Sequence, residues 1–158
     1  MLSNHAVPDV AVLDIVVSIG GAIAFIAIMS LVREPARQKI NATIVAGAGA
    51  AYLAGGLGVW ELAYLACAAP VAYMGLSSYR FIALGWAMHT FWDLVHHFFA
   101  NPIWPFMPAS SAGCAITDSI LVLWLLFEAP SIWDIACRRR RLGVSTDSAI
   151  STRAPCDH

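Results

Sequence analysis

Charged residues are scarce in this sequence. Asp, Glu, Lys and Arg make up 12% of its 158 residues, whereas soluble domains carry about 25%. Disordered chains and nucleic-acid-binding proteins depend on abundant charge, so both classes are excluded. The four cysteines share no C-x-x-C spacing, which excludes a zinc ribbon and a dithiol redox motif.

Apolar residues are present in large excess. They form 59% of the chain, and the mean hydropathy is +0.71. A small soluble domain leaves much of its surface in water, so one core could not hide this much apolar side chain. The composition therefore predicts an integral membrane protein whose main partner is the lipid bilayer.

Five apolar stretches approach the length of about 20 residues that a bilayer-spanning helix needs. We predict spans at about 10–32, 40–60, 62–79, 81–100 and 114–133. The short connections after the second and third spans indicate antiparallel neighbours. The expected fold is all-α, a polytopic five-helix transmembrane bundle over residues 1–137, followed by a basic, disordered cytoplasmic tail at 138–158.

The basic residues give this bundle an orientation. The chain contains Arg33, Arg37, Lys39, Arg80, Arg138, Arg139, Arg140, Arg141 and Arg153. With five spans, all nine fall on one side, which the positive-inside rule makes cytoplasmic. The N-terminus is then outside, the C-terminus inside, and a bacterial inner membrane is the expected location. A four-span alternative with 62–79 re-entrant would place 138–141 outside, which the same rule disfavours.

Small residues recur along the second span. Ala42, Ala46, Ala50, Ala54 and Gly58 follow one another at four-residue spacing. Such faces let helix backbones approach closely in lipid. They predict packing within the bundle, and homo-oligomerisation through the same face is the alternative.

One span carries several polar residues on one side. His89, Asp93, His96 and His97 lie in the fourth span at positions i, i+4, i+7 and i+8. At about 100° per residue they share a stripe about 100° wide. Ionisable groups inside a membrane are costly and normally face the bundle interior or a wet cavity.

Acids on other spans reach the same depth. Asp14 on the first span and Asp118 on the fifth lie in the outer half of the predicted bundle, and Glu61 lies at the outer mouth of the third. Because the topology was derived from Lys and Arg alone, this convergence is independent of it. The sequence predicts one His/Asp site beneath the outer surface.

Imidazoles and carboxylates together are typical of metal and acid–base sites. The predicted ligands of a divalent metal, Zn or Fe, are His89, His96, His97 and Asp118. Asp93 is the candidate catalytic residue, orienting an imidazole or acting as base toward a metal-bound water. Asp14 is expected to lie beside the metal ligands without binding the metal itself. The alternatives are a metal-free proton site, and pairing that only holds helices together.

The polar stripe resembles motifs of known membrane proteins. Asp93-x-x-His96-His97 is similar to the His-x-x-His-His box of membrane desaturases and hydroxylases, with Asp in place of the first His. The set of His and Asp on several helices also resembles the zinc site of membrane ceramidase-type amidases, without their motif order. The whole chain best resembles small bacterial integral membrane proteins of unknown function, which implies a fold and a location.

The leading functional prediction is a metal-dependent, hydrolase-like enzyme that acts on a lipid or amphiphile. The first alternative is a transporter of a small solute, a metal or protons that uses the same residues. The second is a structural membrane subunit without chemistry. Cys67 and Cys114 both lie in the predicted outer half, as apolar fillers or as a disulfide.

Overall fold

The computed structural model describes residues 6–54, 56–133 and 135–136, and these residues form helices and loops without any strand. The helices are α1 (Val12–Ser30), α2 (Ala36–Ala50), the 3₁₀ turn η1 (Ala51–Ala54), α3 (Val59–Gly75), α4 (Tyr79–Phe98) and α5 (Ser110–Leu126). The predicted tail at 138–158 lies outside the described residues. The all-α prediction is confirmed for the part of the chain that is described.

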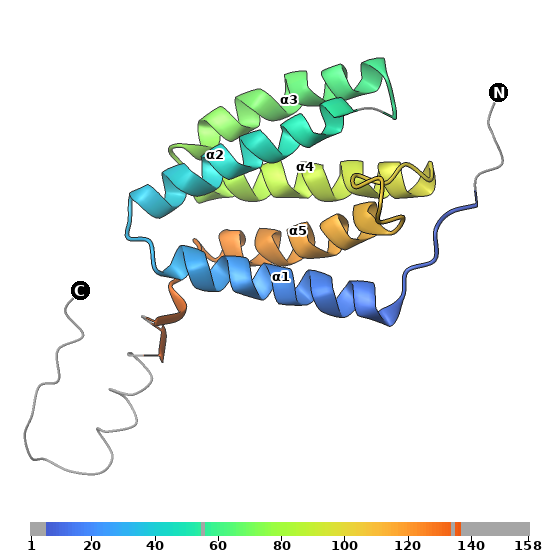
Figure 1. The fold of residues 1–158 in the computed structure, drawn as a ribbon. Coiled ribbons are helices and arrows are strands. Elements are labelled where there is room, and N and C mark those ends of the chain that lie inside the picture. The colour runs from blue at the N-terminus through green and yellow to red at the C-terminus, as the bar shows by residue number, and fades with distance from the viewer. Residues whose placement is uncertain (1–5, 55, 134, 137–158) are drawn as a thin grey trace, which may run out of the picture.

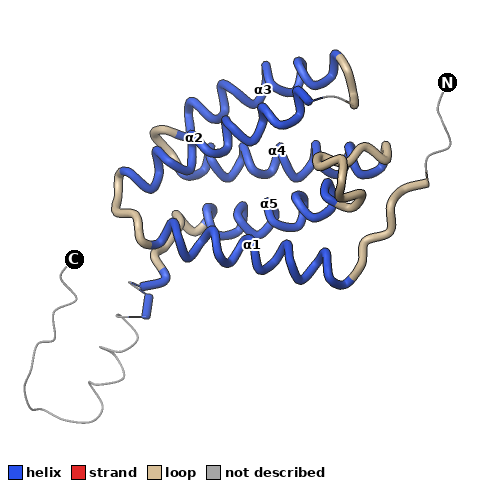
Figure 2. The backbone as a smooth tube through the Cα atoms, viewed as in Figure 1, coloured by secondary structure: helices blue, strands red, loops and turns tan. Residues whose placement is uncertain are grey.

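The helices run alongside one another, with α4 in the middle of the bundle (Figure 1). Helices α2 and α3 pack on one side of α4, α5 packs on the other, and α1 lies against α5. Tan loops join the helix ends, and one of them, between α4 and α5, folds back over the end of the bundle (Figure 2). This arrangement surrounds the predicted polar face of α4 with other helices.

Close packing around α4 depends on glycine. A Cβ added at Gly85 of α4 would lie 3.0 Å from Val45 of α2, and one at Gly49 would lie 3.1 Å from Leu65 of α3. The buried line of α2 therefore runs through Ala42, Val45 and Gly49. Two other residues of the predicted ladder, Ala46 and Ala50, are exposed.

Helix α2 is shorter than its predicted span of 40–60. It begins at Ala36 and gives way after Ala50 to the tighter turn η1. Glycine lowers helix stability by about 1 kcal/mol relative to alanine, and the segment beyond η1 contains Gly56 and Gly58 at positive φ of 120° and 62°. The chain then turns into α3, so the second and third helices form a short hairpin.

One helix of the described chain is long and apolar enough to cross a membrane. This is α1, with 19 residues and a mean hydropathy of 2.4. Helices α3 and α5 are apolar but have 17 residues each. Much of the surface of α1 is hydrophobic, and Leu13, Val16 and Ile23 are 70%, 59% and 57% exposed.

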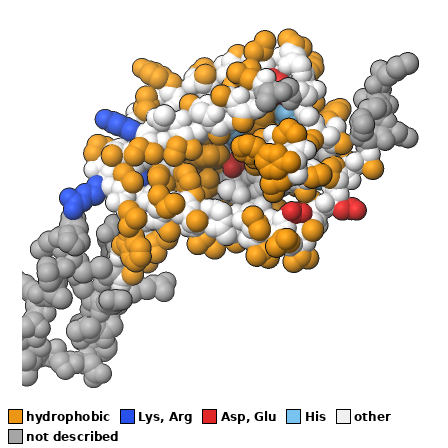
Figure 3. Space-filling model, viewed as in Figure 1, with side chains coloured by type: hydrophobic (Ala, Val, Ile, Leu, Met, Phe, Trp, Pro, Cys, Tyr) orange, Lys and Arg blue, Asp and Glu red, His pale blue; other side chains and the backbone are white. Residues whose placement is uncertain are grey.

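Basic side chains are concentrated at one end of the bundle. On the face that Figure 3 shows, Lys and Arg lie at one end, and the visible acidic side chains lie toward the other end and in the middle. The basic end is where α1 ends and where α2 and α4 begin, so Arg33, Lys39 and Arg80 lie close to it. Hydrophobic side chains are spread over the face between the two ends (Figure 3).

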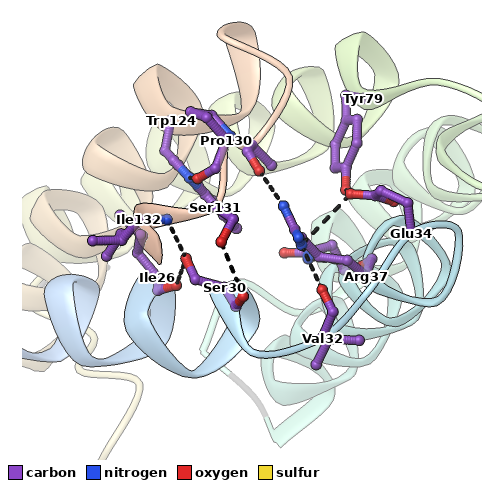
Figure 4. A network of polar contacts seen from close by, with 12 residues as sticks. Ile26, Ser30, Val32, Glu34, Arg37, Tyr79, Trp124, Pro130, Ser131 and Ile132 are labelled. Atoms are coloured by element: carbon purple, nitrogen blue, oxygen red, sulfur yellow. Dashed lines mark hydrogen bonds and ion pairs between the residues drawn. The ribbon is translucent and has the colours of Figure 1, made fainter. Parts of the chain in front are cut away.

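A buried arginine joins three segments at the basic end (Figure 4). Arg37 Nε donates to the Val32 carbonyl at 2.8 Å, and its Nη1 donates to the Ala129 carbonyl at 2.7 Å. Glu34 lies 3.5 Å from the Arg37 guanidinium and accepts a hydrogen bond from the Tyr79 hydroxyl at 2.6 Å. These contacts connect the α1–α2 turn, the start of α4 and the segment after α5.

Candidate functional site

The polar stripe of α4 faces the inside of the bundle. His89, Asp93 and His96 are 2%, 1% and 1% exposed, so each side chain is enclosed by neighbouring helices. His97 is half-buried at the edge of the stripe, and its ring packs against Phe98. Its Nδ1 has no hydrogen-bond partner within the described chain.

A tyrosine from η1 connects two residues of this stripe. The Tyr52 hydroxyl donates to Asp93 Oδ1 at 2.7 Å and lies 3.0 Å from His89 Nδ1. The second ring nitrogen of His89, Nε2, lies 2.9 Å from the Val45 carbonyl oxygen. A carbonyl oxygen only accepts hydrogen bonds, so Nε2 carries a proton.

Asp93 is paired with a second carboxyl group. The side chains of Asp93 and Asp118 lie beside each other across the α4–α5 interface, and Asp118 is 6% exposed. Asp93 Oδ2 receives no hydrogen bond from an N–H group or a hydroxyl in the described residues. The result is one continuous chain of polar contacts, from Asp118 through Asp93 and Tyr52 to His89.

Glu61 organises a second group of contacts beside the first. It lies in the first turn of α3, is 2% exposed, and accepts a hydrogen bond from Trp92 Nε1 at 2.8 Å. Its other oxygen, Oε1, lies 3.1 Å from His96 Nε2 and 3.2 Å from the Leu57 amide nitrogen. The remaining nitrogen of His96, Nδ1, lies 3.0 Å from the Asn101 side-chain amide.

Aromatic rings separate the two imidazoles. The Tyr52 ring centroid lies 5.4 Å from that of His89 and 5.2 Å from that of His96. Tyr64 packs edge-on against Tyr52 at 5.1 Å and stacks on Trp92 at 5.0 Å. The His/Asp site is therefore a packed cluster of rings and carboxyl groups drawn from η1, α3, α4 and α5.

This arrangement does not support the predicted metal centre. In the described residues, no group of three or more His, Cys, Asp and Glu side chains is placed to hold a metal ion. Both ring nitrogens of His89 make polar contacts with protein groups, and metal binding needs a free imidazole nitrogen, so these contacts would have to break first. His96 Nδ1 contacts Asn101, while its Nε2 lies 3.1 Å from Glu61 without a hydrogen bond in the described chain.

A cleft of about 580 Å³ opens between α1, α5 and the α4–α5 loop. Its lining includes Asp14, Trp104, Cys114 and Thr117. The Asp14 carboxylate accepts a hydrogen bond from the Ala11 amide at 2.9 Å, which caps the start of α1. Cys114, on the cleft wall, lies on α5 one helical turn before Asp118. Asp93 and Asp118 are not part of the cleft's lining.

Sequence reasoning missed several members of the cluster. Tyr52 is the only aromatic residue in the run 42–58, and that isolation among small residues was the available signal. Trp92 and Asn101 gave no such signal, since their roles depend on where the α4–α5 loop and α3 pack. Cys67 and Cys114 are free cysteines, so the disulfide alternative is not formed.

Comparison with known proteins gives a family without an assigned activity. No curated protein and no solved structure matches the chain. The family of unknown function DUF6010 matches residues 13–131, which include all five helices except the first residue of α1. The protein, with its buried cluster of His, Tyr and Asp residues, therefore belongs to the DUF6010 family.

Proposed function

We propose that the chain is a multi-pass integral membrane protein with five spans, its N-terminus outside and its basic end in the cytoplasm. The support is the hydrophobic outer surface of α1 together with the concentration of Lys and Arg at one end. Polar residues turned inward and apolar residues turned outward are what a bilayer selects. The ends of the helices shorter than α1 are held at the membrane surface by aromatic anchors such as Trp60, which is exposed.

We further propose that the His/Asp cluster, in the outer half of this bundle, transports protons. Asp93, His89, His96 and Glu61 are each at most 2% exposed. A lipid carbonyl cannot reach groups enclosed to that degree, whereas a proton passes along hydrogen bonds. Burial therefore favours the transporter over the metal-dependent hydrolase, whose water and substrate would both need open space at the site.

The single observation that carries this proposal is that Asp93 and Asp118 lie beside each other in the buried interior, 1% and 6% exposed. Two buried carboxyl groups that lie side by side repel each other when both are ionised, so one of them keeps a proton. A buried pair of this kind holds one exchangeable proton, as carboxylate dyads in enzymes do. In this proposal the proton reaches the pair from the side of the cleft, whose wall holds Cys114 one turn of α5 before Asp118.

Polar atoms also continue from His89 toward the basic end. Val45, whose carbonyl contacts His89, lies one helical turn from Asn41 on α2. Asn41 is fully buried, and its Oδ1 accepts no hydrogen bond within the described chain. Trp86 Nε1 is likewise buried without a partner there. Such atoms are the groups that a passing proton carrier, such as water, would bind.

Proton flux into liposomes tests this proposal. With purified protein, a potassium diffusion potential and an enclosed pH dye, we expect inward flux above that of protein-free liposomes. Asp93→Asn keeps the shape of the side chain but cannot hold the exchangeable proton, so it should lower the flux at least about tenfold. Glu34→Gln makes the same acid-to-amide change at a half-exposed site at the basic end, so it should leave the flux unchanged. Equal flux in the wild type and Asp93→Asn would reject proton transport and favour the structural-subunit alternative.

A further inference from the structure

We propose that Tyr52 relays the proton between Asp93 and His89, an inference that rests on the transport function proposed above. The Tyr52 hydroxyl is the one described group that contacts both residues, at 2.7 Å from Asp93 Oδ1 and 3.0 Å from His89 Nδ1. A hydroxyl donates one hydrogen bond and accepts others at the same time. It can therefore receive a proton on one side while it gives one up on the other.

Two arrangements of protons satisfy this chain equally well. In the first, Asp93 Oδ1 carries a proton and donates it to the Tyr52 oxygen, and the Tyr52 hydroxyl donates to Nδ1 of a neutral His89. In the second, Asp93 is ionised, Tyr52 donates to it, and the Nδ1–H of a cationic His89 donates to Tyr52. One proton moves from Asp93 to Tyr52 while another moves from Tyr52 to His89, so tyrosine is unchanged and the charges sum to zero in both.

The Val45 carbonyl fixes which nitrogen of His89 takes part. Because that carbonyl accepts from Nε2 in both arrangements, only Nδ1 gains or loses a proton. Asp118 lies beside Asp93 and can replace the proton that Asp93 passes on. The relay thus connects the carboxyl pair, reached from the cleft, with the imidazole that lies nearer the middle of α4.

Other ionisable groups lie near Tyr52, but none of the described ones also contacts both Asp93 and His89. His96 packs against the Tyr52 ring, and its nitrogens face Asn101 and Glu61. The ring centroids of Tyr64, from α3, and His89 lie 5.6 Å apart. Its hydroxyl is buried and makes no hydrogen bond with the described residues. Tyr64 therefore resembles Tyr52 in chemistry and place, but it lacks the two contacts that a relay needs.

This difference provides a matched pair of variants. Tyr52→Phe and Tyr64→Phe each remove one buried hydroxyl and keep the ring, so the ring packing around His89 remains. We expect Tyr52→Phe to lower the liposome proton flux at least about tenfold and Tyr64→Phe to leave it within about twofold of the wild type. Thermal unfolding of both variants checks that they fold.

A spectroscopic readout separates a relay from a packing effect. In the wild type, Asp93→Asn should shift the ¹⁵N resonance of His89 Nδ1, because the hydroxyl transmits the change. In the Tyr52→Phe background the same substitution should leave that resonance unchanged, whereas in Tyr64→Phe the shift should persist. If Asp93→Asn lowers the flux but Tyr52→Phe does not, or if both tyrosine variants lower it equally, the relay is wrong and proton transport stands. If no variant changes the flux, proton transport itself fails.

Discussion

Glu61→Ala is expected to lower the free energy of unfolding by about 2–5 kcal/mol, because it removes the acceptor of two buried N–H groups. The carboxylate is 2% exposed, accepts hydrogen bonds from Trp92 Nε1 and the Leu57 amide, and lies 3.1 Å from His96 Nε2. Truncation would leave both N–H groups without an acceptor, in a place that water does not reach, and would remove the carboxylate beside His96. Each buried unsatisfied group costs about 1–3 kcal/mol.

Thermal and denaturant unfolding in detergent micelles would measure this loss. Asp9→Ala is the control, because Asp9 is exposed and precedes α1, and exposed substitutions usually change stability by about 0.5 kcal/mol or less. Glu61→Gln should fall between the two, since one amide oxygen still accepts while the amide N–H₂ faces His96 Nε2. Equal stability of Glu61→Ala and Asp9→Ala would show that the Glu61 contacts do not hold α3 to α4.

Arg37→Ala is expected to destabilise the protein by about 3 kcal/mol, because hydrogen bonds from a charged group contribute about 1.5–3 kcal/mol each. Arg37 is 7% exposed and donates to the carbonyls of Val32 and Ala129. The second bond connects positions 92 residues apart in sequence. Lysine should not restore the loss, because an ammonium group cannot reproduce the planar guanidinium that reaches both carbonyls.

The same unfolding assay tests Arg37, with Arg33→Ala as the control, because Arg33 belongs to the same basic group and is exposed. The account predicts that Arg33→Ala changes the free energy of unfolding by about 0.5 kcal/mol or less. If Arg37→Ala and Arg33→Ala unfold alike, the clamp at the basic end does not stabilise the bundle.

Helical periodicity predicts much of the candidate site. The spacing of His89, Asp93 and His96 predicts one face of one helix, and the structure buries that face. Asp118, from another helix, reaches the same cluster. Regular helices fix the angle and rise of every residue, so side chains on α4 can be placed relative to one another without knowing any tertiary contact.

The site contacts made through irregular segments could not be predicted from the sequence. Tyr52 enters the cluster because α2 gives way to a 3₁₀ turn after Ala50, and no periodicity predicts where that turn points. The contacts of His89 and His96 with Val45 and Asn101 depend on how α2 and the α4–α5 loop pack. Together with the Tyr52 hydroxyl, the Val45 carbonyl occupies both nitrogens of His89, which the metal-site prediction made a ligand. Asp14, grouped with the site by depth, caps its own helix.

The most direct test of the account is ¹⁵N NMR of the His89 side chain in lipid bilayers, before and after addition of zinc. The account predicts a protonated Nε2, hydrogen-bonded to a carbonyl, and a spectrum that zinc does not change. A bare Nε2, or a resonance that shifts on addition of zinc and recovers with a chelator, would contradict it and restore the metal centre.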